Sequence, residues 1–85
     1  MEKLFQVSIV TPDKIVYEGE IYSLIAPGEA GYVGILADHA PLVANLVSGK
    51  ITMKESPGSV KIIESKEKGF LEVMKNRVTI LLDNA

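Results

Sequence analysis

Residues 50–64 read KITMKESPGSVKIIE, and this stretch decides the fold class. Ile51 and Met53 alternate with polar neighbours, which is the two-residue period of a strand with one buried face. The SPGS run at 56–59 is a turn signal, because Pro presets φ and Gly tolerates positive φ. Residues 60–64 then read as a second strand. The stretch therefore predicts two strands joined by a tight turn.

Similar short apolar segments occur on both sides of this stretch. Strands are expected around 5–9, 15–21, 22–26, 42–47, 70–74 and 77–82. Pro27 and Gly28 are expected to end the third of these, because Pro cannot donate to a β-ladder. The glycine-rich residues 28–34 read as a loop or a short hairpin. Asn76 can adopt the left-handed conformation that a tight turn between the last two strands needs.

The regular spacing of strands and turns predicts an all-β fold without a convincing helix. We expect a flattened β-sandwich or barrel of about ten short antiparallel strands, forming a single domain over residues 1–85. Hydrophobic residues make up 47% of the chain, but aromatic residues only 6%, and there is no Trp. The core must therefore consist mainly of Val, Ile and Leu.

Composition excludes several classes of function. The net charge is −2 and the chain has no basic block, which argues against a nucleic-acid partner. The absence of Cys excludes disulfides and thiolate metal sites. No signal peptide is visible, and the longest uncharged stretch, 40–49, is far shorter than the roughly 20 residues of a membrane span. Any membrane association is therefore expected to be indirect.

No residue pattern predicts a catalytic, cofactor or metal site. Gly28, Gly31 and Gly34 lack the Lys and the following helix of a phosphate-binding loop, so they read as turn glycines. His39 is the only His, and zinc requires three or four such ligands. Asp38 adjoins it in sequence, but neighbouring side chains on extended backbone point to opposite sides. A small hydrolase on a β-sandwich would need a nucleophile and base, and none is visible.

One alternative to a non-enzymatic docking protein is a carrier domain. Biotinyl and lipoyl carrier domains are small all-β folds with a modified Lys at a hairpin, often beside Met. Lys54 follows Met53 and precedes the turn at 56–59. An added mass on the intact protein would support this alternative, and an unmodified mass from a competent host would argue against it.

Three separated blocks resemble one family over almost the whole chain. They are VSIVTPD at 7–13 with VYEG at 16–19, the glycine- and proline-containing run from APG at 26–28 to HAPL at 39–42, and GFLEV at 69–73 with NRVTIL at 76–81. Together they resemble the ε subunit of F-type ATP synthases. The resemblance implies a flattened sandwich of two antiparallel sheets, followed by a C-terminal helical hairpin.

The helical hairpin of the family has no counterpart in these 85 residues, which leaves open a naturally short or a truncated subunit. In the family the hairpin inhibits ATP hydrolysis and in some members binds ATP. ATP binding is therefore not expected here, nor is any other cofactor or small-molecule substrate. The resemblance implies a non-catalytic central-stalk subunit that rotates with the γ subunit and the c ring. It would couple proton or sodium flow to ATP synthesis.

The resemblance also implies two contact surfaces. The surface that faces γ maps onto Thr11, His39, Pro41, Leu42, Val43 and Ala44. Pro41, Leu42 and Val43 would offer apolar contact while His39 hydrogen-bonds at the edge. The contact with the c ring maps onto Glu29, Ala30, Gly31 and Tyr32.

The chain departs from the family pattern at two places. Family members often carry an acid where this chain has Tyr32, so Glu29 substitutes for it or Tyr32 packs instead. Residues 66–69, KEKG, are more polar than the small glycine-rich stretch usual in the family. The resemblance places the protein peripherally at the cytoplasmic face of a bacterial inner membrane, with a plastid thylakoid as the alternative.

Overall fold

The computed structural model describes residues 3–83, which contain nine strands and no helix. The strands are β1 (Phe5–Val10), β2 (Ile15–Ile21), β3 (Ser23–Gly28), β4 (Gly31–Leu36), β5 (Leu42–Leu46), β6 (Gly49–Ser56), β7 (Ser59–Ser65), β8 (Gly69–Met74) and β9 (Arg77–Leu82). Because no helix forms in this part of the chain, none is available to span a membrane. The expectation of an all-β fold is confirmed.

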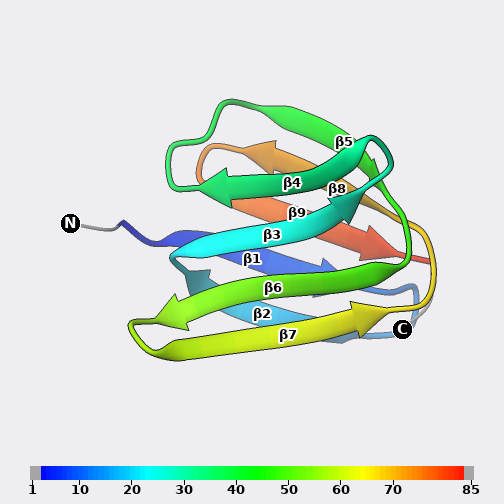
Figure 1. Cartoon of the computed structure of the whole chain (residues 1–85), viewed down its shortest axis with the longest axis horizontal. Helices are drawn as coiled ribbons and strands as arrows, with labels where there is room; N and C mark the ends of the chain where they lie inside the picture. The colour runs from blue at the N-terminus through cyan, green and yellow to red at the C-terminus, as the bar shows by residue number, and fades with distance from the viewer. Residues whose placement is uncertain (1–2, 84–85) are drawn as a thin grey trace.

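The strands form one sheet that curls into two facing layers (Figure 1). One layer has the order β2-β1-β9-β8-β5, and the other has the order β4-β3-β6-β7. A single residue pair, Gly28 with Leu46, connects the two layers at one side through β3 and β5. The molecule is therefore a sandwich whose layers share a seam.

The nine strands of the described residues agree with the expected number of about ten, but one detail of the expected sheet is wrong. β1 runs parallel to β9, with Val7 opposite Val78 and Ile9 opposite Ile80. Hairpins force neighbouring strands to be antiparallel, but β1 and β9 lie at opposite ends of the chain. Their relative direction therefore depends on how the layers pack, which local sequence patterns do not report.

Pro27 does not end its strand as expected, because β3 continues to Gly28. Pro27 lies opposite Tyr32 of β4, and its carbonyl accepts a hydrogen bond from the Val47 N–H at 2.9 Å. The Pro27 nitrogen points to the same side of β3 as the Pro27 carbonyl, away from β4. The missing N–H of proline therefore costs no hydrogen bond to β4. Residues 28–34 were expected to form either a loop or a short hairpin, and they form the hairpin.

The space between the layers is filled by aliphatic side chains. Residues that alternate along each strand are fully enclosed, among them Ile9, Leu71 and Ile80 at 0% exposure. The complete buried set is Phe5, Val7, Ile9, Ile21, Leu24, Ala26, Ile35, Leu46, Ile51, Met53, Leu71, Val73, Val78, Ile80 and Leu82. Only one of these is aromatic, as the composition predicts.

A side-chain hydrogen bond joins the layers at the side opposite the seam. The Tyr17 hydroxyl of β2 donates to a Glu55 carboxylate oxygen of β6 at 2.5 Å, and the Ser59 hydroxyl donates to the other oxygen at 3.3 Å. Burial, this hydrogen bond and the carboxylate charge raise the pKa of Tyr17 to about 12. The bond links strands that are not neighbours in the sheet.

We expect the stability that Tyr17 contributes to disappear at alkaline pH. Because the pKa is raised from 10.0 to about 12 by folding, the contribution is complete below pH 10.0 and is lost as the pH rises through about 12. Below pH 10.0, Tyr17→Phe should lower the free energy of unfolding by about 1–2 kcal/mol. Urea unfolding of both proteins across this range checks it. If the two proteins still differed in their free energy of unfolding above pH 12, the stabilising role of the Tyr17 hydroxyl would be contradicted.

Candidate docking site

The turn between β3 and β4 is shaped by two glycines. Gly31 has φ of 127°, which L side chains rarely adopt. Gly28 has ordinary φ, but a Cβ there would lie 2.6 Å from the Gly31 carbonyl oxygen and 2.9 Å from Val33. The Glu29 N–H donates to the Asn45 carbonyl at 2.9 Å, which holds the turn against β5. The turn is therefore fixed by backbone contacts within itself and by one hydrogen bond to β5.

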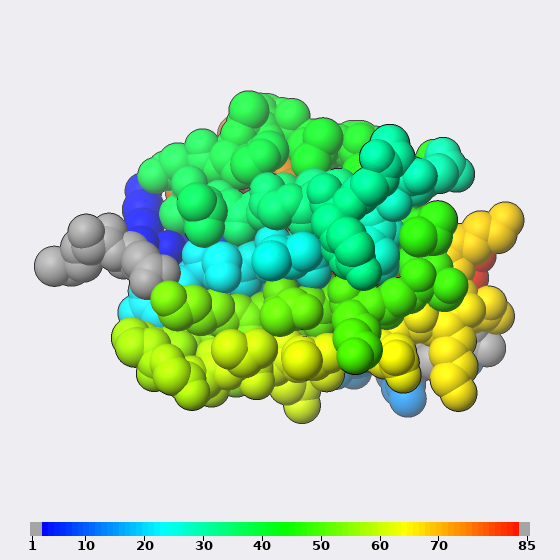
Figure 2. Space-filling model, viewed as in Figure 1, coloured from blue at the N-terminus to red at the C-terminus, as the bar shows by residue number. Residues whose placement is uncertain are grey.

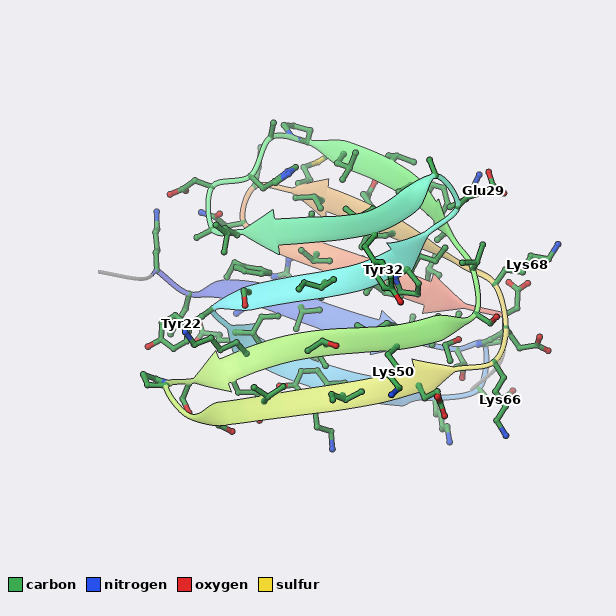
Figure 3. All side chains as sticks on the ribbon, in the orientation of Figure 1. Tyr22, Glu29, Tyr32, Lys50, Lys66 and Lys68 are labelled. Carbon is green, nitrogen blue, oxygen red and sulfur yellow. The ribbon has the colours of Figure 1, made fainter. Side chains whose placement is uncertain are left out.

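A hollow of about 360 Å³ lies between this turn and β5. It is lined by Gly28, Glu29, Ala30, Gly31, Tyr32, Val33, Val43, Ala44 and Asn45. It therefore contains all four residues expected to face the c ring and two of those expected to face γ. Tyr32 is 73% exposed at its rim, and Glu29 is exposed at the end of the hairpin (Figure 3). The fold thus brings the two predicted surfaces together.

The loop between β4 and β5 carries His39 and Pro41 at the other end of β4. Asp38 has φ of 62° there, and its N–H and carboxylate bond to the Asn76 side chain at 2.5 and 2.9 Å. The Lys3 ammonium lies 3.1 Å from the same carboxylate. The Asn76 bond and then Lys3 lower the pKa of Asp38. The His39 Nδ1–H donates to the Ala40 carbonyl at 2.7 Å.

The structure does not bring all the residues expected to face γ onto one surface. Leu42 packs against the core while Val43 is 59% exposed, because they are consecutive on β5. Thr11 follows the C-terminal end of β1, whereas His39 lies at the end of the sandwich where β1 begins. Thr11 and His39 are thus at opposite ends of the molecule, and a common partner would have to extend along it.

The sequence interpretation missed Asn76 as a functional candidate. Its predicted role as a left-handed turn residue is confirmed by φ of 59°, with Lys75 at 50°. In addition, its carbonyl accepts from the Gln6 N–H at 3.0 Å, and its side chain holds Asp38. Asn76 therefore joins β1, the β4–β5 loop and the β8–β9 turn. Nothing in the sequence signals a contact between residues so far apart.

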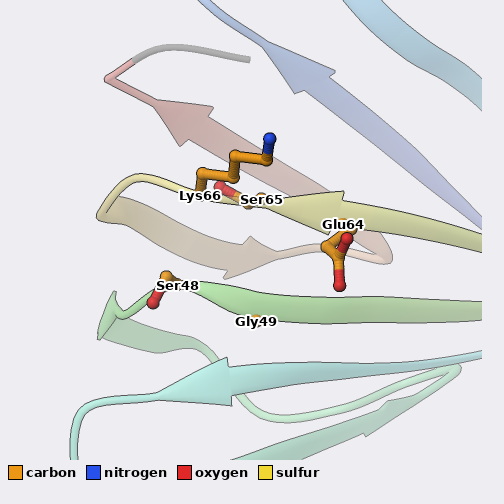
Figure 4. A pocket seen from close by; sticks show the side chains of 5 residues that line it. All are labelled: Ser48, Gly49, Glu64, Ser65 and Lys66. Carbon is orange, nitrogen blue, oxygen red and sulfur yellow. The ribbon is translucent and has the colours of Figure 1, made fainter.

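A second hollow, of about 430 Å³, lies where β6 begins and β7 ends (Figure 4). Its lining residues are Ser48, Gly49, Glu64, Ser65 and Lys66. The Ser65 hydroxyl is the buried polar group there, and it donates to the Glu67 carbonyl at 3.0 Å. That bond stabilises the connection at 66–69. Between residues 3 and 83, no group of three or more His, Asp or Glu side chains could hold a metal ion.

Lys54 lies within β6, opposite Val60 of β7 and Ser23 of β3, and is partly buried. A modified Lys of a carrier domain must project from a hairpin, where an enzyme can reach it. The tip of this hairpin is at 57–58 instead. The position of Lys54 therefore argues against the carrier alternative.

By its layers, strand order and aliphatic core, the chain is a small β-sandwich module. A family model described as "ATP synthase, Delta/Epsilon chain, beta-sandwich domain" matches residues 4–85. The chain belongs to this family of ATP synthase δ/ε β-sandwich domains.

Individual relatives agree with that family. An ATP synthase epsilon chain of Leptospira borgpetersenii is 46% identical over 92% of this chain and 60% of its own length. One of Dichelobacter nodosus is 39% identical over 100% of this chain and 59% of its own. The chain thus spans about 60% of these relatives. An epsilon chain of Chlorobium limicola is 41% identical and is covered over 93% of its length.

Solved structures show the same fold at low sequence identity. A chain in the Euglena gracilis mitochondrial ATP synthase (OSCP/F1/c-ring, rotational state 1) superposes with a TM-score of 0.87 at 18% identity. The match covers 95% of this chain and 51% of that one. A chain in the central stalk/c-ring of the Tetrahymena thermophila mitochondrial enzyme gives 0.75 at 16% identity, with 95% and 64% covered. The fold is therefore shared with chains of ATP synthase assemblies.

Proposed function

We propose that the chain is a non-catalytic rotor subunit of an F-type ATP synthase that docks on the γ subunit and the c ring. Its task is to transmit torque from proton or sodium flow to the catalytic head. The observation that carries the proposal is the hollow between the β3–β4 turn and β5, where both predicted contact surfaces meet in a chain of the δ/ε family.

The packing of the sandwich suits this mechanical task. Its layers share an aliphatic core, the Gly28–Leu46 seam at one side and the Tyr17–Glu55 bond at the other. Closely packed interiors deform little under load. Shear between the layers would break core contacts and this hydrogen bond together, so the module resists it as a unit.

Two groups of exposed residues supply the proposed partner contacts. Val43 and Pro41 offer exposed apolar surface to γ, with His39 at the edge of that surface. Glu29, Ala30, Gly31 and Tyr32 form the exposed hairpin end that faces the c ring. We further propose peripheral attachment at the cytoplasmic face of a bacterial membrane, and the bacterial relatives support this location.

Introducing a charge at Val43 should release γ. Val43→Asp places a carboxylate in an apolar contact without a partner, which should weaken binding about tenfold or more. The matched control is Val60→Asp, because Val60 on β7 has the same 59% exposure. The measurement is capture of purified γ by each variant. Capture of a detergent-solubilised c ring by the unchanged chain tests the second proposed partner. Equal capture of γ by both variants would refute the assigned surface.

A further inference from the structure

The connection between β7 and β8, KEKG at 66–69, belongs to neither of the proposed contact surfaces but lies at the same end of the sandwich as the β3–β4 hairpin. Gly28 pairs with Leu46, and Leu46 pairs with Gly69, so β5 alone separates the two turns. Neighbouring strands are about 5 Å apart, which places Gly28 and Gly69 about 10 Å from each other. In Figure 2 the golden yellow atoms of the connection and the blue-green atoms of the hairpin both project from this end.

Hydrogen bonds hold the backbone of this connection in place. Ser65 is 3% exposed, and its hydroxyl donates to the Glu67 carbonyl at 3.0 Å and accepts from the Glu67 N–H at 3.4 Å. The Lys68 carbonyl accepts from the Asp83 N–H at 3.1 Å. A segment whose backbone is already fixed loses less conformational freedom on binding than a mobile loop. The connection therefore presents its side chains at defined positions, as a contact surface requires.

Both lysines of the connection are exposed and have no ionic partner in the described part of the chain. Lys66 and Lys68 form no ion pair between residues 3 and 83, although Glu67 lies between them and Asp83 bonds to the Lys68 backbone. Lys66 also lines the hollow of about 430 Å³, together with Ser48. A carboxylate that enters this hollow can meet an ammonium group and a hydroxyl donor. The connection thus offers two free cations at the end of the sandwich.

Charges of both signs at this end determine which kind of partner fits it. Glu29 on the hairpin is exposed and, in the described residues, has no ion pair, and Glu64 lines the same hollow as Lys66. A surface of anionic lipid would attract the two lysines but repel these two acids. A protein surface can present an acid to the lysines and a base to Glu29 side by side. The mixed charge therefore favours a protein, and the partner proposed at this end is the c ring.

We propose that the connection at 66–69 is a second contact for the c ring, in which Lys66 and Lys68 bind acidic side chains of the ring. One carboxylate enters the hollow beside Lys66 and Ser48, and another meets Lys68 on the side of the hairpin. The inference rests on the proposed docking function and adds the chemistry of the partner to it. A ring with acids at this surface is selected over a ring without them, because unmatched charges at an interface are unfavourable.

The test is capture of a detergent-solubilised c ring by the full chain. Lys66→Glu/Lys68→Glu should bind the ring about tenfold more weakly or worse, because the reversed charges repel the acids of the ring. The matched control is Lys61→Glu/Lys75→Glu, which changes the net charge equally at two exposed lysines, one on β7 and one at the β8–β9 turn. It should bind within about threefold of the unchanged chain. Capture by the unchanged chain should also weaken as salt is added.

Amine acetylation of the unchanged chain, read by mass spectrometry, gives an independent measurement that needs no variant. In the complex with the ring, Lys66 and Lys68 should be protected while Lys61 and Lys75 still react. Capture of the ring without this protection, or equal capture by the folded Lys66→Glu/Lys68→Glu variant, overturns the second contact and leaves the docking function intact. Failure of the unchanged chain to capture the ring overturns both. Protection by vesicles of anionic phospholipid but not by the ring assigns the lysines to lipid and overturns the proposal.

Discussion

Replacing Ile80 with alanine is expected to lower the free energy of unfolding by about 2–5 kcal/mol. Ile80 lies on β9 between β1 and β8, where it pairs with Ile9 and Leu71. All three side chains are 0% exposed, so truncation leaves a cavity that the two neighbouring strands cannot easily fill. Since a domain of this size has a total stability of only about 5–10 kcal/mol, much of it would be lost.

Urea unfolding with matched denaturant slopes measures this effect. Leu81→Ala is the control, because Leu81 is the next residue on the same strand and is 49% exposed. Its truncation should cost less than about 1 kcal/mol. Similar losses for the two variants would show that the alternation along β9 does not separate core from surface.

Gly28→Ala should be the more damaging of two glycine substitutions in the same hairpin. The added Cβ would lie 2.6 Å from the backbone oxygen of Gly31, which cannot move without distorting the turn. Overpacking of this kind costs about 1–3 kcal/mol. Because Gly28 also pairs with Leu46, a shift there disturbs the seam between the layers.

Gly34→Ala is the matched comparison. Its Cβ meets no atom within 4 Å, and loss of glycine's freedom in the unfolded chain should leave stability unchanged or raise it by up to about 1 kcal/mol. Thermal and urea unfolding of the two variants measure the contrast. Equal destabilisation would mean that glycine serves the strand at both positions.

Local sequence predicted most of the secondary structure because the signals are physically local. Alternation at Ile51 and Met53 marks the side of β6 that is buried, and both residues are 0% exposed. The turn at 56–59 and the left-handed Asn76 form as expected, since Pro, Gly and Asn bias their own dihedral angles. These preferences act within a few residues and require no knowledge of the packing.

The candidate site was only partly predictable. The resemblance predicted contact roles for Glu29–Tyr32 and for the residues around Val43, but not that they line one hollow. It also grouped Thr11 with His39, and consecutive Leu42 with Val43, although strand direction and alternation separate each pair. Which residues share a surface depends on how the two layers pack against each other. No short sequence pattern encodes that packing.

By itself, the sequence determined the all-β class, the aliphatic core and the positions of the turns, because alternation and turn chemistry act between near neighbours. Only the tertiary structure decided the parallel pairing of β1 with β9 and the Asp38–Asn76 contact. Each of these joins segments distant along the chain. Such pairings follow from how the two layers minimise exposed apolar surface together, which no single segment specifies.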